Sequence, residues 1–343
     1  MKITFVALTL CKGGAQRVLV DIANGLFNRG HDVVMVMPPW GDVEYDVKPP
    51  ISRSRGPVLM ESDLPKSDII VSNFFTTVPV VAEACSKGKG KHLRFSLCYE
   101  PMFLPEQDVS FQSYNQTPYL VVISNYQKQL ISLVHGIEGE IMPVYVEDTF
   151  RNLSIRNPNR LSITAIVRKP EGGFSWQRDQ TYLLEQLVKV RSAFPALKYN
   201  LICPPNELAS SPFLQELRAS GSYHFYTPAN DEELCHHYNE ADIFVTSSIF
   251  ETAVLPGLEA MKCGAALAAV YAGGNTEYCR HETNCLLSYR FEERLASDII
   301  RLITNPSLRF NLAQAGQKEA LSWSLERSVA IFEEICLRIH AKS

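Results

Sequence analysis

A chain of 343 residues is longer than one ordinary hydrophobic core supports, so we expect two domains of about 150 residues each. Hydrophobic residues make up 46% of the chain, and apolar and helical segments alternate along it. This pattern predicts an α/β protein and excludes a disordered or fibrous one. The formal net charge of −4 gives no electrostatic reason to expect nucleic acid as a partner.

The N-terminal segment predicts a strand, a glycine turn, an amphipathic helix and a second strand. The first strand is MKITFVALTL, and the remainder is CKGGAQRVLVDIANGLFNRGHDVVMVMP, residues 11–38. Gly13 and Gly14 lack the G-x-G-x-x-G spacing of a dinucleotide fingerprint, which weakens the interpretation as a nicotinamide oxidoreductase. They favour a backbone turn that lets a substrate or phosphate come close, with a simple tight turn as the alternative.

A basic segment, SKGKGKHLR (residues 86–94), precedes the predicted strand RFSLCYE. It could meet an anionic membrane surface or a phosphorylated acceptor. The alternative is a solvated loop, which is how short charge runs usually behave. We expect a cytoplasmic protein because no signal-like start and no apolar run of about 18 residues is present, with contact at the inner face of the membrane as a further possibility.

The domain boundary is expected at the polar segment EDTFRNLSIRNPNR (residues 147–160), which follows the last predicted N-terminal strand, EGEIMPVYV. We therefore assign residues 1–150 to the first domain and residues 151–322 to the second, with the linker as a hinge. Residues 323–343 belong to a C-terminal amphipathic helix that begins near Ser324.

Positive charge appears at the first strand-to-helix junction of the second domain, in IVRKPEGGFSWQRDQTYLLEQL. Arg168 ends the strand, and Arg178 precedes the next helix. Guanidinium groups can hold a diphosphate through two hydrogen bonds and stabilise it as a leaving group. Lys169 is a further candidate, and an ordinary pair of surface arginines is the alternative.

Two glutamates, Glu251 and Glu259, bracket a predicted strand-to-helix turn in SSIFETAVLPGLEAMKCG, residues 247–264. Pro256 fits the first turn of a helix, where a missing N–H costs little. The start of a helix attracts phosphate, and a carboxylate one turn inside it can accept the hydroxyls of a ribose. The pattern indicates a nucleotide-sugar site, although such a pair also occurs on solvated helix faces.

The run from Glu240 to Ser288 resembles the retaining GT-B glycosyltransferases of family 4. It carries their E-x7-E motif, the EAM-x-x-G helix and a GG-x-x-E turn from Gly273 to Glu277. The resemblance implies a GT-B fold, in which two Rossmann-like domains face each other across a cleft and the C-terminal helix crosses back onto the N-terminal domain. It places the donor mainly on the C-terminal domain and the acceptor against the N-terminal one.

By this resemblance, Glu259 holds the ribose, and Glu251 holds the sugar. The sugar also meets the backbone amides of four residues, Thr252, Ala253, Val254 and Leu255. Arg168 and Arg178 neutralise the diphosphate. Arg178 stands where the family carries a lysine, since the aliphatic residues Leu183 and Leu184 follow it at the family's distance of five and six positions. Gly13 and Gly14 also count among the candidate binding residues.

The chain departs from the family pattern at several places, one of which is a longer Gly-rich segment, residues 170–177, between the two arginines. Cys98, Tyr99 and Glu100 stand where many members carry a histidine that helps to position the donor sugar. Glu100 is therefore a candidate contact to the donor or acceptor, or else a structural carboxylate. Thr252 replaces the usual glycine after the first glutamate, which narrows the backbone choices of the loop.

The resemblance implies metal-independent, retaining transfer to an acceptor hydroxyl, with the departing phosphate taking the acceptor proton. The expected donor is a nucleotide diphosphate sugar, a UDP-sugar in our prediction, and we expect no cofactor and no metal. The acceptor is a saccharide, a lipid-linked molecule, a protein or a small molecule. A non-catalytic nucleotide-sugar-binding or regulatory protein on the same fold is the alternative.

Nine cysteines are present without any C-x-x-C spacing, and their odd number argues against a complete disulfide framework. We expect buried, reduced thiols, including Cys11, Cys98, Cys203 and Cys263.

Overall fold

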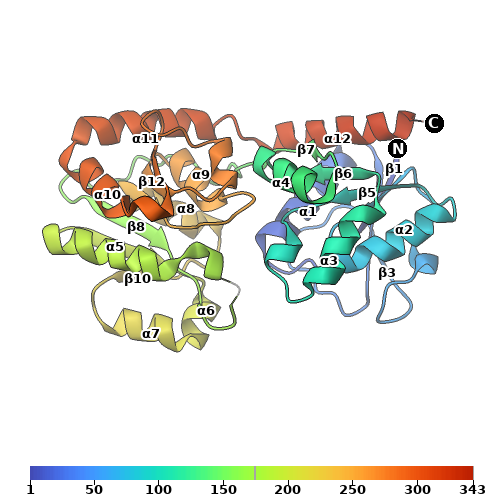
Figure 1. The fold of residues 1–343 in the computed structure, drawn as a ribbon, viewed down its shortest axis with the longest axis horizontal. Helices are drawn as coiled ribbons and strands as arrows, with labels where there is room; N and C mark the ends of the chain where they lie inside the picture. The colour runs from blue at the N-terminus through green and yellow to red at the C-terminus, as the bar shows by residue number, and fades with distance from the viewer. Residues whose placement is uncertain (174, 343) are drawn as a thin grey trace. The chain divides into compact units, whose positions relative to one another are not determined.

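The computed structural model describes residues 1–173 and 175–342 and forms two compact units (Figure 1). The first unit comprises Met1–Tyr145 and Leu325–Ser343, and the second comprises Val146–Ser324. Each unit is built on a sheet whose paired strands all run parallel, with helices connecting them. The predicted fold class, two Rossmann-like α/β domains with a C-terminal helix that returns to the first, is confirmed.

The sheet of the first unit has the strand order β3-β2-β1-β4-β5-β6-β7. Ile3 of β1 is paired with Val33 on one side and with Ile69 on the other, so β1 is central. Central parallel strands are buried on both faces, and β1 is buried from Ile3 to Val6, with Thr4 as its one polar residue in that run. The strands are β1 (Lys2–Val6), β2 (Asp32–Met37), β3 (Ile51–Arg53), β4 (Ile69–Ser72), β5 (Lys91–Phe95), β6 (Tyr119–Val122) and β7 (Glu140–Ile141).

Helices of the first unit include the C-terminal helix α12, drawn in dark red in Figure 1. Phe332 of α12 packs on Phe5 and Phe95, with ring centroids 6.1 Å and 5.0 Å apart. Gly25 lets the first helix approach α12, because a Cβ there would lie 2.4 Å from a methyl of Val329. The helices are α1 (Gly14–Asn28), α2 (Val78–Ser86), α3 (Gln107–Ser113), α4 (Asn125–His135) and α12 (Leu325–Ala341).

The sheet of the second unit has the strand order β10-β9-β8-β11-β12-β13. Its strands are β8 (Ser162–Ile166), β9 (Lys198–Ile202), β10 (His224–Tyr226), β11 (Ile243–Thr246), β12 (Ala266–Val270) and β13 (Leu286–Ser288). Its helices are α5 (Gln180–Ala193), α6 (Pro205–Ser210), α7 (Pro212–Ala219), α8 (Asp231–Glu240), α9 (Leu255–Lys262), α10 (Leu295–Thr304) and α11 (Pro306–Ala320). Ile163, Leu201 and Val245 from three adjacent strands are buried in one apolar core.

The polar segment expected to form a hinge is held on the second unit. The buried Lys262 donates to the carbonyl oxygens of Val146 and Glu147 at 2.8 Å and 3.0 Å. Arg156 donates to the carbonyl oxygens of Ala241 and Cys263 at 2.7 Å and 2.8 Å. These bonds fix both ends of the segment, so it belongs to the second unit from Val146 onward.

The basic segment of residues 86–94 is partly strand, since β5 begins at Lys91. Lys87 pairs with Glu61 and with Glu83, at 2.8 Å each, and Lys89 pairs with Glu61 at 2.6 Å. Both lysines thus form ion pairs with carboxylates of their own unit.

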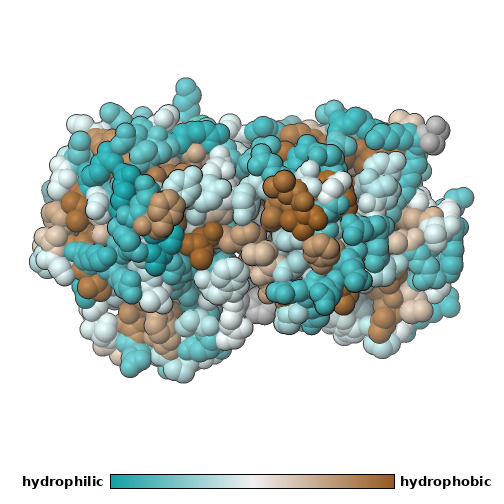
Figure 2. All heavy atoms as spheres, in the orientation of Figure 1, coloured by the Kyte–Doolittle hydropathy of each residue, from teal (hydrophilic) through white to brown (hydrophobic). Residues whose placement is uncertain are grey.

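The surface seen in Figure 2 is mixed, with hydrophilic residues interrupted by small apolar groups, one of them over α4. Leu133 of α4 is exposed. Within residues 1–173 and 175–342, each helix is too short or too polar to cross a lipid bilayer.

Candidate functional site

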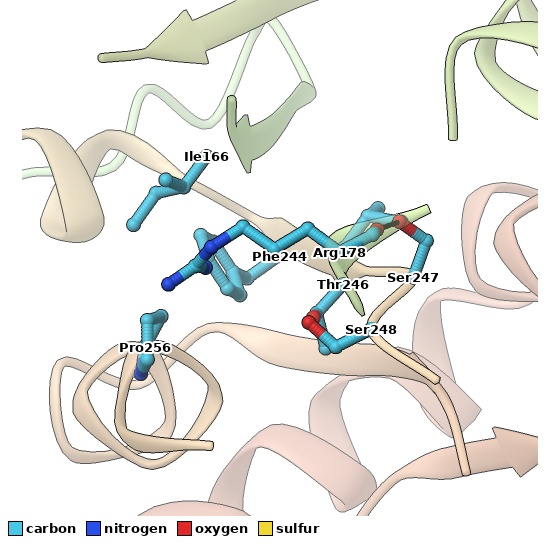
Figure 3. Close-up of a pocket in the computed structure, with 8 residues that line it drawn as sticks. Ile166, Arg178, Phe244, Thr246, Ser247, Ser248 and Pro256 are labelled. Atoms are coloured by element: carbon cyan, nitrogen blue, oxygen red, sulfur yellow. Dashed lines mark hydrogen bonds between the residues drawn. The ribbon is translucent and has the colours of Figure 1, made fainter. Parts of the chain in front are cut away.

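The second unit has a switch in strand order between β8 and β11, which lie side by side although the chain visits β9 and β10 between them. In open parallel sheets, ligands bind outside the carboxyl ends of the strands at such a switch. A hollow opens at this edge (Figure 3). Its lining residues are Ile166, Arg178, Phe244, Val245, Thr246, Ser247, Ser248 and Pro256.

The hollow is narrow. It offers about 10 Å³ to the centre of a water-sized sphere, which is room for about one water molecule. Pockets that enclose drug-sized ligands measure about 300–1,000 Å³. A larger ligand would therefore lie across the strand ends, with the hollow as its deepest point.

Arg178 is held at this edge by bonds to the backbone around it. The Ser247 hydroxyl donates to the carbonyl oxygen of Arg178 at 2.6 Å, and the Ile249 amide donates to that of Gln177 at 2.8 Å. The next residue, Asp179, has a left-handed backbone with φ of 44° and accepts a bond from Arg290. In Figure 3 the Arg178 guanidinium lies between Ile166 and Pro256.

Glu251 lies beside Arg178, with 4.0 Å between Glu251 Oε1 and Arg178 Nη2. Their side chains are 17% and 22% exposed, so both are accessible to a ligand but largely removed from water. Burial raises the pKa of the Glu251 carboxyl, and the charge of Arg178 opposes that rise. The structure thus brings together a cation and a carboxylate that are far apart in the sequence.

The loop after Glu251 is fastened to the glycine turn that follows β12. The Glu251 amide donates to the Ala272 carbonyl oxygen, and the Gly274 amide donates to the Glu251 carbonyl oxygen, both at 2.8 Å. A Cβ on Gly274 would lie 2.2 Å from the carbonyl oxygen of Thr252. Only glycine permits this approach, because the obstructing atom is backbone.

We expect Gly274→Ala to displace the loop that carries Glu251 and to lower the free energy of unfolding by about 1–3 kcal/mol, the usual cost of overpacking. Thermal unfolding measures the change. Gly56→Ala is the control, since an added methyl there meets its nearest atom at 4.0 Å. Equal melting temperatures for the two variants would show that the close approach does not hold the loop.

Helix α9 begins at this edge, and Pro256 in its first turn lines the hollow. The residue that precedes the helix, Val254, makes no side-chain cap, so no side chain at that position competes for the first-turn amides. Tyr278 donates to the Val254 carbonyl oxygen at 2.6 Å and fixes the entry into the helix. Thr252 and Val254 are buried, whereas Ala253 and Leu255 are partly exposed.

Glu259 follows one turn inside α9 and is partly exposed. Its Oε2 accepts a hydrogen bond from the Tyr238 hydroxyl of α8 at 2.8 Å. Tyr238 is fully buried, so it holds the carboxylate from the protein side.

Arg168 lies just beyond the end of β8, where it forms an ion pair with Glu207. Its Nε lies 2.8 Å from Oε1 and 2.9 Å from Oε2 of Glu207. Lys169 is partly exposed, and its Nζ lies 3.4 Å from the Ser210 hydroxyl. The sequence reasoning missed Glu207, whose only sequence signal is a carboxylate shortly after the next strand end.

Gly13 and Gly14 lie in the first unit. They follow β1 and open α1. The Tyr45 hydroxyl accepts a bond from the Gly13 amide at 2.8 Å and donates to the Gly13 carbonyl oxygen at 3.0 Å. The Tyr45 hydroxyl thus bonds to both the amide and the carbonyl oxygen of Gly13.

Glu100 is also in the first unit, and both oxygens of its carboxylate accept hydrogen bonds from residues of that unit. It is 3% exposed and pairs with Arg94, which is fully buried. The Phe75 amide donates to its Oε1 at 3.0 Å, and the Tyr114 hydroxyl donates to its Oε2 at 3.1 Å. These contacts hold the Glu100 carboxylate inside the first unit.

Metal ligands and cysteines are the other candidate groups. Across the described residues no group of three or more His, Cys, Asp and Glu side chains has the geometry to hold a metal ion. All nine cysteines are thiols outside any disulfide. Cys203 and Cys263 are buried, but Cys11 and Cys98 are only partly so, which corrects the expectation for those two.

Part of this site lies in a segment that matches a known protein family. Residues 172–319 match the family model described as Glycosyl transferases group 1, a segment that includes Arg178, Glu251 and Glu259. A D-inositol 3-phosphate glycosyltransferase from Salinispora arenicola (strain CNS-205) is 29% identical over 130 residues. That alignment covers 38% of this chain and 28% of the relative, so the two chains align over little more than a quarter of the relative's length.

Solved structures match over nearly the whole chain. Sucrose-phosphate synthase from Thermosynechococcus elongatus has a TM-score of 0.80 at 17% identity, covering 100% of both chains. Anabaena Alr3699/HepE in complex with UDP has a TM-score of 0.76 at 16% identity, covering 98% of this chain and 99% of that one. The chain has the GT-B fold. Together with the domain match, this fold supports a GT-B glycosyltransferase.

Proposed function

We propose that this protein is a retaining glycosyltransferase that moves a sugar from a nucleotide diphosphate sugar to an acceptor hydroxyl without a metal ion. The observation that carries the proposal is the meeting of Arg178, Glu251 and the start of α9 at the β8–β11 switch. A diphosphate carries negative charge, and both a guanidinium group and a helix start favour it. Arg178, Glu251 and the start of α9 lie in the segment that matches the glycosyltransferase group 1 domain.

The donor we propose is a UDP-sugar. Anabaena HepE, a structural neighbour, was solved with UDP and with UDP-glucose. In our account Glu259 accepts the ribose hydroxyls, and Arg168 and Arg178 hold the two phosphates. Glu251 and the amides of residues 252–255 hold the sugar.

Transfer in this account breaks the bond between the anomeric carbon and the phosphate oxygen and forms a bond from that carbon to the acceptor oxygen. The departing phosphate takes the acceptor proton on the same face of the sugar, so configuration is retained. HepE was also solved with UDP and glucose. The arginines stabilise the charge that develops on the leaving group.

The experiment that tests the proposal is a thermal-shift screen of nucleotide sugars followed by a transfer assay. A ligand at about 100 times its dissociation constant stabilises the fold by roughly 2.7 kcal/mol. Stabilisation together with transfer supports the enzyme. Stabilisation with neither transfer nor donor hydrolysis would favour the alternative, a nucleotide-sugar-binding or regulatory protein on this fold.

We expect Glu259→Ala to weaken UDP binding by roughly 1.5–3 kcal/mol for each lost charge-assisted bond, as measured by calorimetric titration. The variant also leaves the Tyr238 hydroxyl without its partner carboxylate. Tyr238→Phe is therefore the control, because it keeps the carboxylate and removes only the bond that holds it. Unchanged UDP affinity in folded Glu259→Ala would remove Glu259 from the site.

We expect Glu251→Gln to reduce transfer while UDP affinity stays nearly constant, because the side chain meets the sugar and not the nucleotide in our account. Turnover at saturating donor and calorimetry with UDP measure the two quantities. Glu216→Gln on α7 is the control, since it removes an exposed carboxylate outside the site. Equal losses in both measurements would contradict the separate roles of the two glutamates.

A further inference from the structure

We propose that Glu207 is a positioning residue that holds the Arg168 guanidinium with one edge turned to the donor diphosphate. The proposal rests on the function proposed above and adds a residue to that site. Glu207 lies in α6, which follows β9, the strand paired with β8. It therefore reaches Arg168 from the neighbouring strand end.

The contacts fix both the side chain and the backbone. Both carboxylate oxygens of Glu207 accept from Arg168 Nε, at 2.8 Å and 2.9 Å, and Oε1 also accepts from Nη2. Oε2 accepts from the Lys169 amide at 2.8 Å. The backbone amide of Arg168 itself donates to Gln180 Oε1. The arginine is thus held at its amide, its side chain and the peptide that follows it.

The opposite edge of the guanidinium is available. A guanidinium has five N–H donors in a planar fork, and Glu207 engages the Nε and Nη2 side of it. Within residues 1–173 and 175–342, Arg168 Nη1 has no hydrogen-bond partner. The Arg168 side chain is 38% exposed, so this edge is within reach of a ligand.

Glu207 is itself ionised at neutral pH. Burial raises the pKa of its carboxyl, but the hydrogen bonds from Arg168 and from the Lys169 amide outweigh burial and hold the pKa below the ordinary value. A partly exposed ion pair contributes little to stability. The pair matters more for orientation than for stability, because an arginine that is ordered before binding loses less conformational entropy when the ligand binds.

Charge and orientation predict opposite results for Glu207→Ala. If Glu207 acted only through its charge, its removal would increase the local positive potential and tighten the binding of a diphosphate. If it positions Arg168, its removal frees the side chain and weakens binding. We expect Glu207→Ala to bind UDP about tenfold more weakly, equivalent to about 1.4 kcal/mol. Glu207→Gln, which keeps one acceptor oxygen, should lie between wild type and alanine.

A double-mutant cycle with Arg168→Ala tests whether the effect passes through Arg168. Calorimetric titration with UDP is made on wild type, both single variants and the double variant, with Glu216→Ala as the control for loss of an exposed carboxylate. We expect Glu207→Ala to cause no further loss once Arg168 is alanine. Melting temperatures show that each variant is folded, and Glu207→Gln replaces alanine in the cycle if that variant is not.

The inference is overturned if Glu207→Ala binds UDP as tightly as wild type or more tightly, or if its loss persists undiminished in the Arg168→Ala background. If wild type binds UDP but transfers no sugar, the proposed transfer activity is contradicted. The double-mutant cycle on UDP binding still decides the role of Glu207 in that case. Wild type that binds none of UDP, ADP and GDP would overturn both.

Discussion

Arg168→Ala is expected to lower transfer turnover by about 10²–10³-fold, the usual loss when one preorganised charge-stabilising group is removed. The physical reason is that the Arg168 guanidinium stabilises the negative charge that develops on the leaving diphosphate as the glycosidic bond breaks. Turnover at saturating donor measures the effect. Arg168→Lys should restore only part of the activity, because a point charge cannot bond at two positions like a guanidinium group.

The control for Arg168→Ala follows from the ion pair that Arg168 forms with Glu207 in wild type. Arg168→Ala leaves the Glu207 carboxylate without its cation, beside the expected phosphate position. The double change Arg168→Ala with Glu207→Gln removes that repulsion and isolates the loss of the arginine. Normal turnover in Arg168→Ala would move the phosphate role to Arg178 or Lys169.

Glu100→Ala is expected to destabilise the first unit by about 3–5 kcal/mol, because it leaves the fully buried Arg94 without its counter-charge. Arg94 also lies over the Tyr114 ring, 3.6 Å from its centroid, so the cluster is tightly packed. Denaturant unfolding of the variant and wild type measures the difference. UDP affinity below the transition should not change, since the donor site is expected on the second unit.

Replacing both members of this pair, as in Arg94→Met with Glu100→Leu, is the control, because removing both charges is often much less costly than removing one. A Glu100→Ala protein with wild-type stability and abolished donor binding would instead support a substrate contact at Glu100.

The fold could be read from the sequence because local patterns determine it. Continuous apolar runs alternate with amphipathic helices, and that alternation requires parallel strands with crossover helices. The helix start near Pro256 and the glycine turn at Gly273–Gly274 were also predictable, since proline at a first helical turn and glycine in close turns have steric causes.

Polar pairing was not predictable to the same extent. Arg168 with Glu207, Arg94 with Glu100, and Glu259 with Tyr238 each join groups from different elements. No spacing along the chain encodes such pairs, because they depend on how neighbouring strand ends and helices bring side chains together. For the same reason the hydrogen bonds by which Lys262 and Arg156 hold residues 147–160 on the second unit could not be predicted from the sequence.

The most direct test of the account is the release of nucleoside diphosphate from a panel of UDP-, ADP- and GDP-sugars with saccharide acceptors, measured in the presence of EDTA. We predict that wild type consumes at least one donor, a UDP-sugar first, and that added magnesium or manganese gives no further increase. Activity that EDTA abolishes and a divalent ion restores would contradict the metal-independent mechanism. Failure to bind or consume any donor, with or without metal, would contradict the proposed glycosyltransferase.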